Sequence, residues 1–120
     1  MSFMKKYKIC FDLDGTICEN KLENQSYADL KPLNGAVEVL KDLKKDGHYI
    51  IILTARNMKT YENNIGKVIA NQSKVVIDWL NKWEVPYDEL HFGKPVADIY
   101  VDDKGYKLKN WKKFNDDLGI

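Results

Sequence analysis

The chain has 120 residues, of which 44% are hydrophobic and 31% are charged, and its formal net charge is +1. These values fit one globular domain with its own core, over residues 1–120, and exclude an intrinsically disordered chain. So small a net charge predicts no affinity for nucleic acid or for an anionic membrane. No apolar run approaches the ~20 residues of a membrane span.

Two further features of composition predict a cytoplasmic protein. The first residues lack the long apolar core of a secretory signal. Cys10 and Cys18 lack the spacing of a metal site. We interpret both as reduced thiols, which are typical of the cytoplasm.

The first predicted element is a buried strand over residues 7–12, followed by two carboxylates, a glycine and a hydroxyl. Residues two apart in a strand point to the same side, so Asp12 and Asp14 start out facing one way. Gly15 then permits a sharp turn. Two carboxylates held close usually serve a cation, a shared proton or a catalytic task. The simpler interpretation, two aspartates that form a turn, is favoured only for an isolated pair.

The middle of the chain predicts a strand–helix–strand unit with parallel strands. Residues 16–33 form a long polar loop of the kind that is usually functional. Helical spacing covers residues 36–45, and a buried, β-branched strand follows over residues 49–53, ending at Thr54. We expect the right-handed crossover that joins parallel strands.

The second half predicts a loop and four further elements. The loop spans residues 57–64. The elements are a helix that begins near 67 or 73 and ends near 83, strands at 89–92 and 98–101, and an amphipathic helix between 108 and 118.

Polar residues follow three of these strands, namely Asp12, Thr54 and the pair Asp102–Asp103. In a parallel sheet the carboxyl ends of the strands lie along one edge, where open α/β sheets bind ligands. Lys94, in the turn before the fourth predicted strand, can reach the same edge.

Carboxylates, a lysine and a hydroxyl at one edge suit magnesium-assisted phosphoryl transfer. Mg²⁺ prefers oxygen ligands and is held by one or two carboxylates together with substrate phosphate. One aspartate can form a covalent aspartyl-phosphate, and a second can act as general acid and then as base. The lysine and the hydroxyl would stabilise charge on the phosphoryl oxygens.

The sequence resembles the haloacid dehalogenase-like phosphatase superfamily. Asp12–Thr16 is similar to its first motif, Leu53–Arg56 to its second, Lys94–Pro95 to its third and Asp102–Asp103 to its fourth, in the family's order. The resemblance implies an α/β fold: a three-layer Rossmann-like sandwich around a parallel sheet with strand order 3-2-1-4. It also implies a Mg²⁺-dependent hydrolase that acts on phosphomonoesters.

The resemblance further implies roles for single residues. Asp12 would be the nucleophile and a Mg²⁺ ligand, and Asp14 the general acid and base with its backbone carbonyl on the metal. Thr54 would bind the phosphoryl group, and Lys94 would hold Asp12 and the phosphate in place.

Four other residues complete the expected site. Asp103 would contact the metal directly, and Asp102 mainly through water. Thr16 would contact the substrate. For Arg56 two interpretations stay open, which are a contact with the substrate and an ion pair at the sheet edge.

The loops at 16–33 and 57–74 are too short to fold as a cap domain, so we expect a capless enzyme with an exposed cleft. Tyr27 and Tyr61, in these loops, are candidates to touch the substrate. Within the superfamily the motifs are similar to small bacterial and phage proteins of capsule or surface-polysaccharide synthesis. A sugar phosphate, a nucleotide and a phosphate exposed on a larger molecule all stay open as substrates, and the cleft leaves room for a second subunit of a homo-oligomer.

Two other classes of function compete with the phosphatase. One is a receiver-like signalling domain that accepts a phosphoryl group, and the other is a non-catalytic binding module. A receiver carries its phosphorylated aspartate in mid-chain, before the threonine, but no aspartate ends a predicted strand between Asp14 and Thr54. Since no motif residue is missing, nothing in the sequence favours the binding module.

Overall fold

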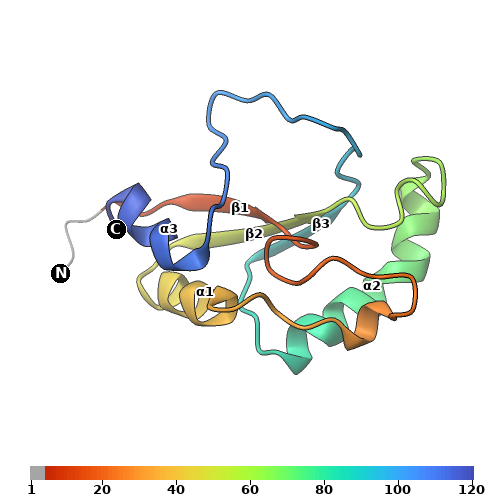
Figure 1. Ribbon diagram of the computed structural model, residues 1–120, viewed down its shortest axis with the longest axis horizontal. Helices are drawn as coiled ribbons and strands as arrows, with labels where there is room; N and C mark the ends of the chain where they lie inside the picture. Colours follow the sequence, from red (N-terminus) through yellow and green to blue (C-terminus); the bar gives the residue numbers. More distant parts are fainter. Residues whose placement is uncertain (1–4) are drawn as a thin grey trace.

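The computed structural model describes residues 5–120 and contains a three-stranded parallel sheet with the order β1-β2-β3. The strands are β1 (Lys8–Asp12), β2 (Tyr49–Thr54) and β3 (Glu89–Phe92). The helices are α1 (Ala36–Lys45) between β1 and β2, α2 (Ile65–Lys82) between β2 and β3, and α3 (Trp111–Leu118) near the C-terminus (Figure 1). A single 3₁₀ turn, η1 (Tyr27–Asp29), interrupts the loop after β1. The predicted Rossmann-like α/β arrangement is confirmed.

One face of the sheet carries the core. In β2, Ile50, Ile52 and Thr54 are fully buried, and the register sets Ile9 and Phe11 of β1 beside the two isoleucines. Helix α1 covers this face because Ala36, Leu40 and Leu43 recur at helical spacing and are all buried.

Helix α3 packs at the β1 end of the same face. The rings of Trp111 and Phe114 lie 5.5 and 5.7 Å from the ring of Phe11. The Trp111 indole N–H also donates to the backbone carbonyl of Thr16 at 2.9 Å. The C-terminal helix therefore anchors the loop that follows β1.

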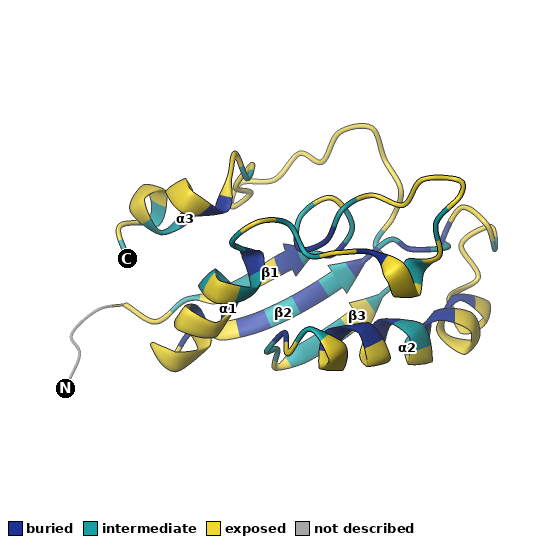
Figure 2. Ribbon diagram, turned by 60° about the horizontal axis from the view of Figure 1, so that its bottom comes forward, coloured by how far each residue is buried: buried dark blue, intermediate teal, exposed yellow. Residues whose placement is uncertain are grey.

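The opposite face of the sheet differs from the expected three-layer sandwich. By strand alternation this face carries Cys10, Tyr49 and His91, all of which are exposed. Figure 2 shows exposed positions, in yellow, along the strands themselves. Within residues 5–120 the core lies on one face of the sheet only. Helix α3 does not cover the opposite face, because it packs on Phe11 and joins the same core.

The strand expected at residues 98–101 is not formed in this structure. The sheet therefore supplies the 3-2-1 part of the expected order, and residues 93–110 form a long loop that leaves the sheet (Figure 1). The Tyr100 hydroxyl donates to the Pro95 carbonyl at 2.5 Å and accepts from the Ala97 N–H at 3.3 Å, and the Tyr100 ring lies 4.4 Å from Lys94 Nζ. These local contacts close a small loop where strand pairing was expected.

The described part of the chain contains no helix with the length and apolar character needed to cross a bilayer.

Candidate active site

A tight turn after β1 positions the two motif aspartates. The backbone N–H groups of Thr16, Ile17 and Cys18 all point at the Leu13 carbonyl, at 3.3, 2.9 and 3.1 Å. Gly15 has φ +82°, and a Cβ there would lie 3.0 Å from the Asn20 amide. The turn therefore requires glycine, and it directs Asp14 toward the end of β2.

Asp14 forms a bidentate ion pair with Arg56, which lies just after β2. Arg56 Nη2 donates to Asp14 Oδ1 at 2.8 Å, and Nε donates to Oδ2 at 3.2 Å. The Arg56 side chain is 1% exposed and that of Asp14 is 23% exposed. Of the two interpretations that the sequence left open for Arg56, the structure shows the ion pair.

Tyr27 and Cys18 enclose this pair. The Arg56 guanidinium carbon lies 4.0 Å from the centroid of the Tyr27 ring, which is a cation–π stack. The Cys18 thiol donates to Asp14 Oδ1 at 3.4 Å. Burial, followed by the charge of Asp14, raises the pKa of Cys18 to about 12 and also raises the pKa of Tyr27. Both groups stay protonated beside the carboxylate at neutral pH.

Asp12, at the end of β1, lies next to Lys94. The distance from Lys94 Nζ to Asp12 Oδ1 is 3.7 Å, and the two side chains are 21% and 33% exposed. Burial raises the pKa of the Asp12 carboxyl, while the charge of Lys94 opposes that rise. The Lys94 backbone N–H donates to the Thr54 carbonyl at 3.1 Å, so the end of β2 holds Lys94 near Asp12.

The two predicted threonines occupy different environments. Thr54 is fully buried, and its hydroxyl oxygen accepts the backbone N–H of Arg56 at 3.0 Å. This bond fixes the start of the turn that carries Arg56. Thr16 is half-buried beyond Asp14, where its carbonyl accepts the Trp111 indole N–H, and its side chain does not line the pocket described next.

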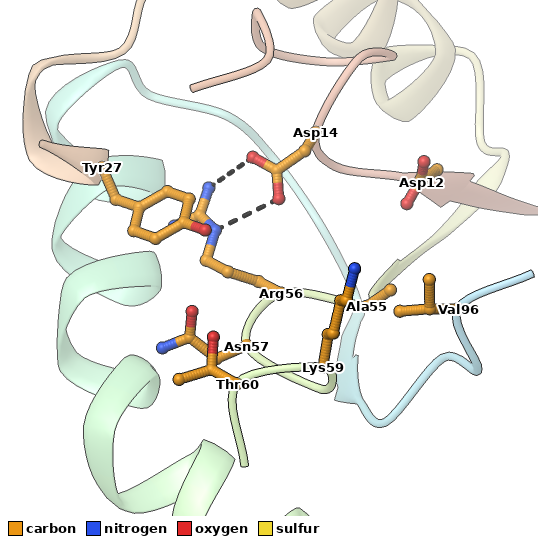
Figure 3. Close-up of a pocket in the computed structure, with 9 residues that line it drawn as sticks. All are labelled: Asp12, Asp14, Tyr27, Ala55, Arg56, Asn57, Lys59, Thr60 and Val96. Atoms are coloured by element: carbon orange, nitrogen blue, oxygen red, sulfur yellow. Dashed lines mark hydrogen bonds and ion pairs between the residues drawn. The ribbon is translucent and has the colours of Figure 1, made fainter. Parts of the chain in front are cut away.

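An open pocket of about 270 Å³ lies between the carboxyl ends of β1 and β2. Figure 3 shows Asp14 and Arg56 facing each other at one side of it, with Asp12 at the other. The predicted residues Asp12, Asp14 and Arg56 line the pocket, as does the loop residue Tyr27, while Thr54, Lys94 and Tyr61 do not. The remaining lining residues are Ala55, Asn57, Lys59, Thr60 and Val96.

Sequence reasoning missed the polar residues Asn57, Lys59 and Thr60 of this wall. They follow the second motif directly, in a turn that carries Asn57 at φ +61°. That left-handed conformation is tolerated by asparagine and is otherwise uncommon. An asparagine directly after a motif at a strand end is the signal that identifies this turn.

The structure does not bring Asp102 and Asp103 to the pocket. Both are exposed in the loop that leaves the sheet, and Asp102 Oδ1 accepts the Lys104 backbone N–H at 2.8 Å, which lowers the pKa of Asp102. Among residues 5–120 no three acidic, histidine or cysteine side chains gather as a metal site. The chain thus has the oxygen donors that Mg²⁺ prefers, but of the four predicted metal ligands only Asp12 and Asp14 line the pocket in this arrangement.

Comparison with known proteins identifies a family that the chain matches. Residues 20–115 match the family model described as "5′ nucleotidase, deoxy (Pyrimidine), cytosolic type C protein". A crystal structure of a protein from Vibrio cholerae is 36% identical, with a TM-score of 0.76, and the alignment covers 86% of this chain and 84% of that one. None of the curated proteins matches. The family match includes Thr54, Arg56, Lys94 and the acidic pair, and it begins after Asp12 and Asp14.

Proposed function

Because the chain belongs to the family of cytosolic type C 5′ nucleotidases, which are phosphomonoesterases of the haloacid dehalogenase-like superfamily, we propose that it hydrolyses a phosphomonoester through an aspartyl-phosphate on Asp12. One observation supports this proposal above the others. Asp12 and Asp14 come from one strand end, face one open pocket, and are each paired with a cation.

The proposed reaction has two steps. A carboxylate oxygen of Asp12 attacks phosphorus and forms an O–P bond, while the bond from phosphorus to the leaving oxygen breaks. Asp14 takes part in this step in its protonated form, still bonded to Arg56, and its carboxyl group gives that proton to the leaving oxygen. Water then attacks phosphorus and gives a proton to the Asp14 carboxylate, and the bond to Asp12 breaks with release of inorganic phosphate.

Lys94 and Thr54 are the proposed phosphate contacts. The Lys94 ammonium lies 3.7 Å from Asp12 Oδ1, so it can hold the nucleophile and offset charge on the transferring oxygens. The Thr54 hydroxyl accepts a bond from Arg56 N and keeps its own proton to donate. Thr16 is proposed as an additional contact from the turn after Asp14.

Mg²⁺ is the proposed cofactor. Asp12 would supply a carboxylate, Asp14 its backbone carbonyl, Asp103 a direct ligand and Asp102 a contact through water. The metal would neutralise charge on the phosphoryl oxygens. For the acidic pair to take part, residues 98–101 must approach the free edge of β1. We therefore propose the order 3-2-1-4 for the metal-bound enzyme.

The family name favours a nucleoside monophosphate as the first substrate to test. The open pocket also admits a sugar phosphate, including one of surface-polysaccharide metabolism, and a phosphate exposed on a larger molecule. A cytoplasmic location fits these substrates.

Phosphate release from a panel of phosphomonoesters, with Mg²⁺ and with EDTA, tests the proposal. Asp12→Asn is compared with Asp42→Asn, an exposed change on α1. We expect magnesium-dependent release by the wild type and Asp42→Asn, and none by Asp12→Asn. Release that survives in Asp12→Asn would remove Asp12 as the nucleophile. A stable phosphorylated Asp12 without turnover would instead support a signalling module.

A further inference from the structure

We infer that Arg56, stacked on Tyr27, is the positioning residue that sets the orientation of the Asp14 carboxyl group for proton transfer to the leaving oxygen. This inference rests on the proposed function. It assigns Arg56 a role toward Asp14 rather than toward the substrate. Of the chain's 19 lysines and arginines, Arg56 alone is an arginine.

The first support is the geometry of the pair. The two bonds from Arg56, at 2.8 and 3.2 Å, reach both carboxylate oxygens of Asp14. A planar fork that bonds both oxygens fixes the plane of a carboxylate as well as its position, which the single ammonium of a lysine does not do. Asp14 therefore has one defined orientation at the pocket wall.

The second support is that Arg56 is itself held in place and buried. Its backbone N–H bonds the Thr54 hydroxyl, its guanidinium carbon lies 4.0 Å from the Tyr27 ring centroid, and its side chain is 1% exposed. Within residues 5–120 the Nη1 group has no hydrogen-bond partner. The burial of the guanidinium is thus offset mainly by Asp14 and Tyr27, and the group has little surface left for a substrate.

The consequence concerns leaving groups. A general acid must lie within hydrogen-bond reach of the oxygen that it protonates, and a small misplacement is costly. An alkoxide leaving group needs that proton, whereas a nitrophenolate leaves readily without it. Loss of a positioning residue should therefore slow alkyl phosphates selectively, and loss of a substrate contact should raise KM for both classes alike.

The test measures kcat and KM for p-nitrophenyl phosphate and for a nucleoside 5′-monophosphate with the wild type and Arg56→Met. We expect kcat for the nucleotide to fall ~100-fold, the scale of general acid catalysis, and kcat for the aryl ester to fall less than ~3-fold. Arg56→Lys should restore only part of the nucleotide kcat that Arg56→Met loses, because lysine keeps the charge but cannot bond both carboxylate oxygens. Lys41→Met, an exposed change on α1, is the control.

Each outcome decides a separate point. Equal losses of kcat on both esters, or a change confined to KM, would overturn the positioning role of Arg56. Neither result would contradict the proposed phosphatase activity. No turnover of any ester by the wild type would overturn the proposed function and this inference together. If Arg56→Met does not fold, Tyr27→Leu keeps the ion pair but removes the stacking ring, and it should show the same selective loss to a smaller degree.

A second readout needs no turnover, because phenylglyoxal can modify only one arginine in this chain. We expect slow modification in the wild type, where the guanidinium is buried and paired, and several-fold faster modification in Asp14→Asn and in Tyr27→Leu. Mass spectrometry of the peptide that contains Arg56 gives the rates. Equal rates in all three proteins would show that neither side chain holds Arg56.

Discussion

Two regions of the molecule carry motif residues, and they differ in how firmly the fold holds them. The end of β2 carries Thr54 and Arg56 on the central strand of the sheet, with a parallel neighbour on each side. The segment with Asp102 and Asp103 follows three apolar residues in a loop that makes no strand pairing. The residues after β2 meet partners 42 positions away, whereas those of the second segment bond to close sequence neighbours.

The difference shows that the position of a motif residue depends on whether the segment before it is a paired, buried strand. Thr54 is completely buried, and Val101 is 95% exposed. When a strand is buried under a helix, the residue at its end has a fixed position and can form specific hydrogen bonds. An exposed segment has no such constraint, so its carboxylates need another source of order, such as a metal ion.

The largest expected effect tests the well-held region through Asp14→Asn. Removing the Asp14 carboxylate leaves the charge of the buried Arg56 guanidinium uncompensated, which we expect to cost about 3 kcal/mol of unfolding free energy. Asp102→Asn, the matched change in the exposed segment, should cost less than about 0.5 kcal/mol without metal. Urea unfolding in EDTA measures both, and equal costs would remove the contrast between the two regions.

A somewhat smaller effect tests the acidic pair as metal ligands. We expect Asp103→Asn to raise the Mg²⁺ concentration for half-maximal activity about 10- to 100-fold, and Asp102→Asn to raise it less. Asp42→Asn supplies an exposed carboxylate control. If the magnesium titration of Asp103→Asn overlaid that of the control, Asp103 would not be a ligand.

The sequence predicted the well-held region in detail. The ranges expected for the first helix and the third strand match α1 and β3, and those for the first two strands match β1 and β2 within a residue. These segments succeed because strong hydrophobic periodicity agrees with deep burial. The rule that parallel strands end along one edge placed Asp12, Thr54 and Lys94 together, and the Lys94 N–H does bond the Thr54 carbonyl beside Asp12.

The sequence was less informative where local contacts compete with the sheet. The run Ile99–Val101 has strand-forming residues, but only three of them lie between two aspartates. Tyr100 instead bonds back to Pro95 and Ala97. The Tyr27 stack on Arg56 was also beyond reach, because it depends on how the 16–33 loop folds back over the end of β2.

The third prediction asks whether metal changes the second region. Val101→Ser should alter the unfolding free energy by less than about 0.5 kcal/mol in EDTA, since the side chain is almost fully exposed. With saturating Mg²⁺ it should cost about 1.5 kcal/mol, the value of burying a valine, if the segment packs on β1. The same small cost in both buffers would show that the loop keeps its exposed arrangement and would refute the fourth strand.

The smallest effect tests whether water is excluded from Cys18, beside Asp14 and the end of β2. It is measured through the pH dependence of the unfolding free energy. The Cys18 thiol has a folded-state pKa of about 12 against an ordinary value of 9.0, because it is buried beside the Asp14 carboxylate. A raised pKa means that the unfolded chain loses this proton first as the pH rises. The stabilisation is complete below pH 9 and is lost between pH 9 and about 12.

We therefore expect the unfolding free energy to fall by about 1 kcal/mol more between pH 8 and pH 10 in a Cys10→Ala background than in the Cys10→Ala/Cys18→Ala double variant. The background removes the titration of the exposed Cys10, and the lysines and tyrosines titrate in both proteins. Parallel pH profiles would mean that the thiol reaches water in the folded state. In that case the loop over Asp14 would open as readily as the segment after β3, and the two regions would be held alike.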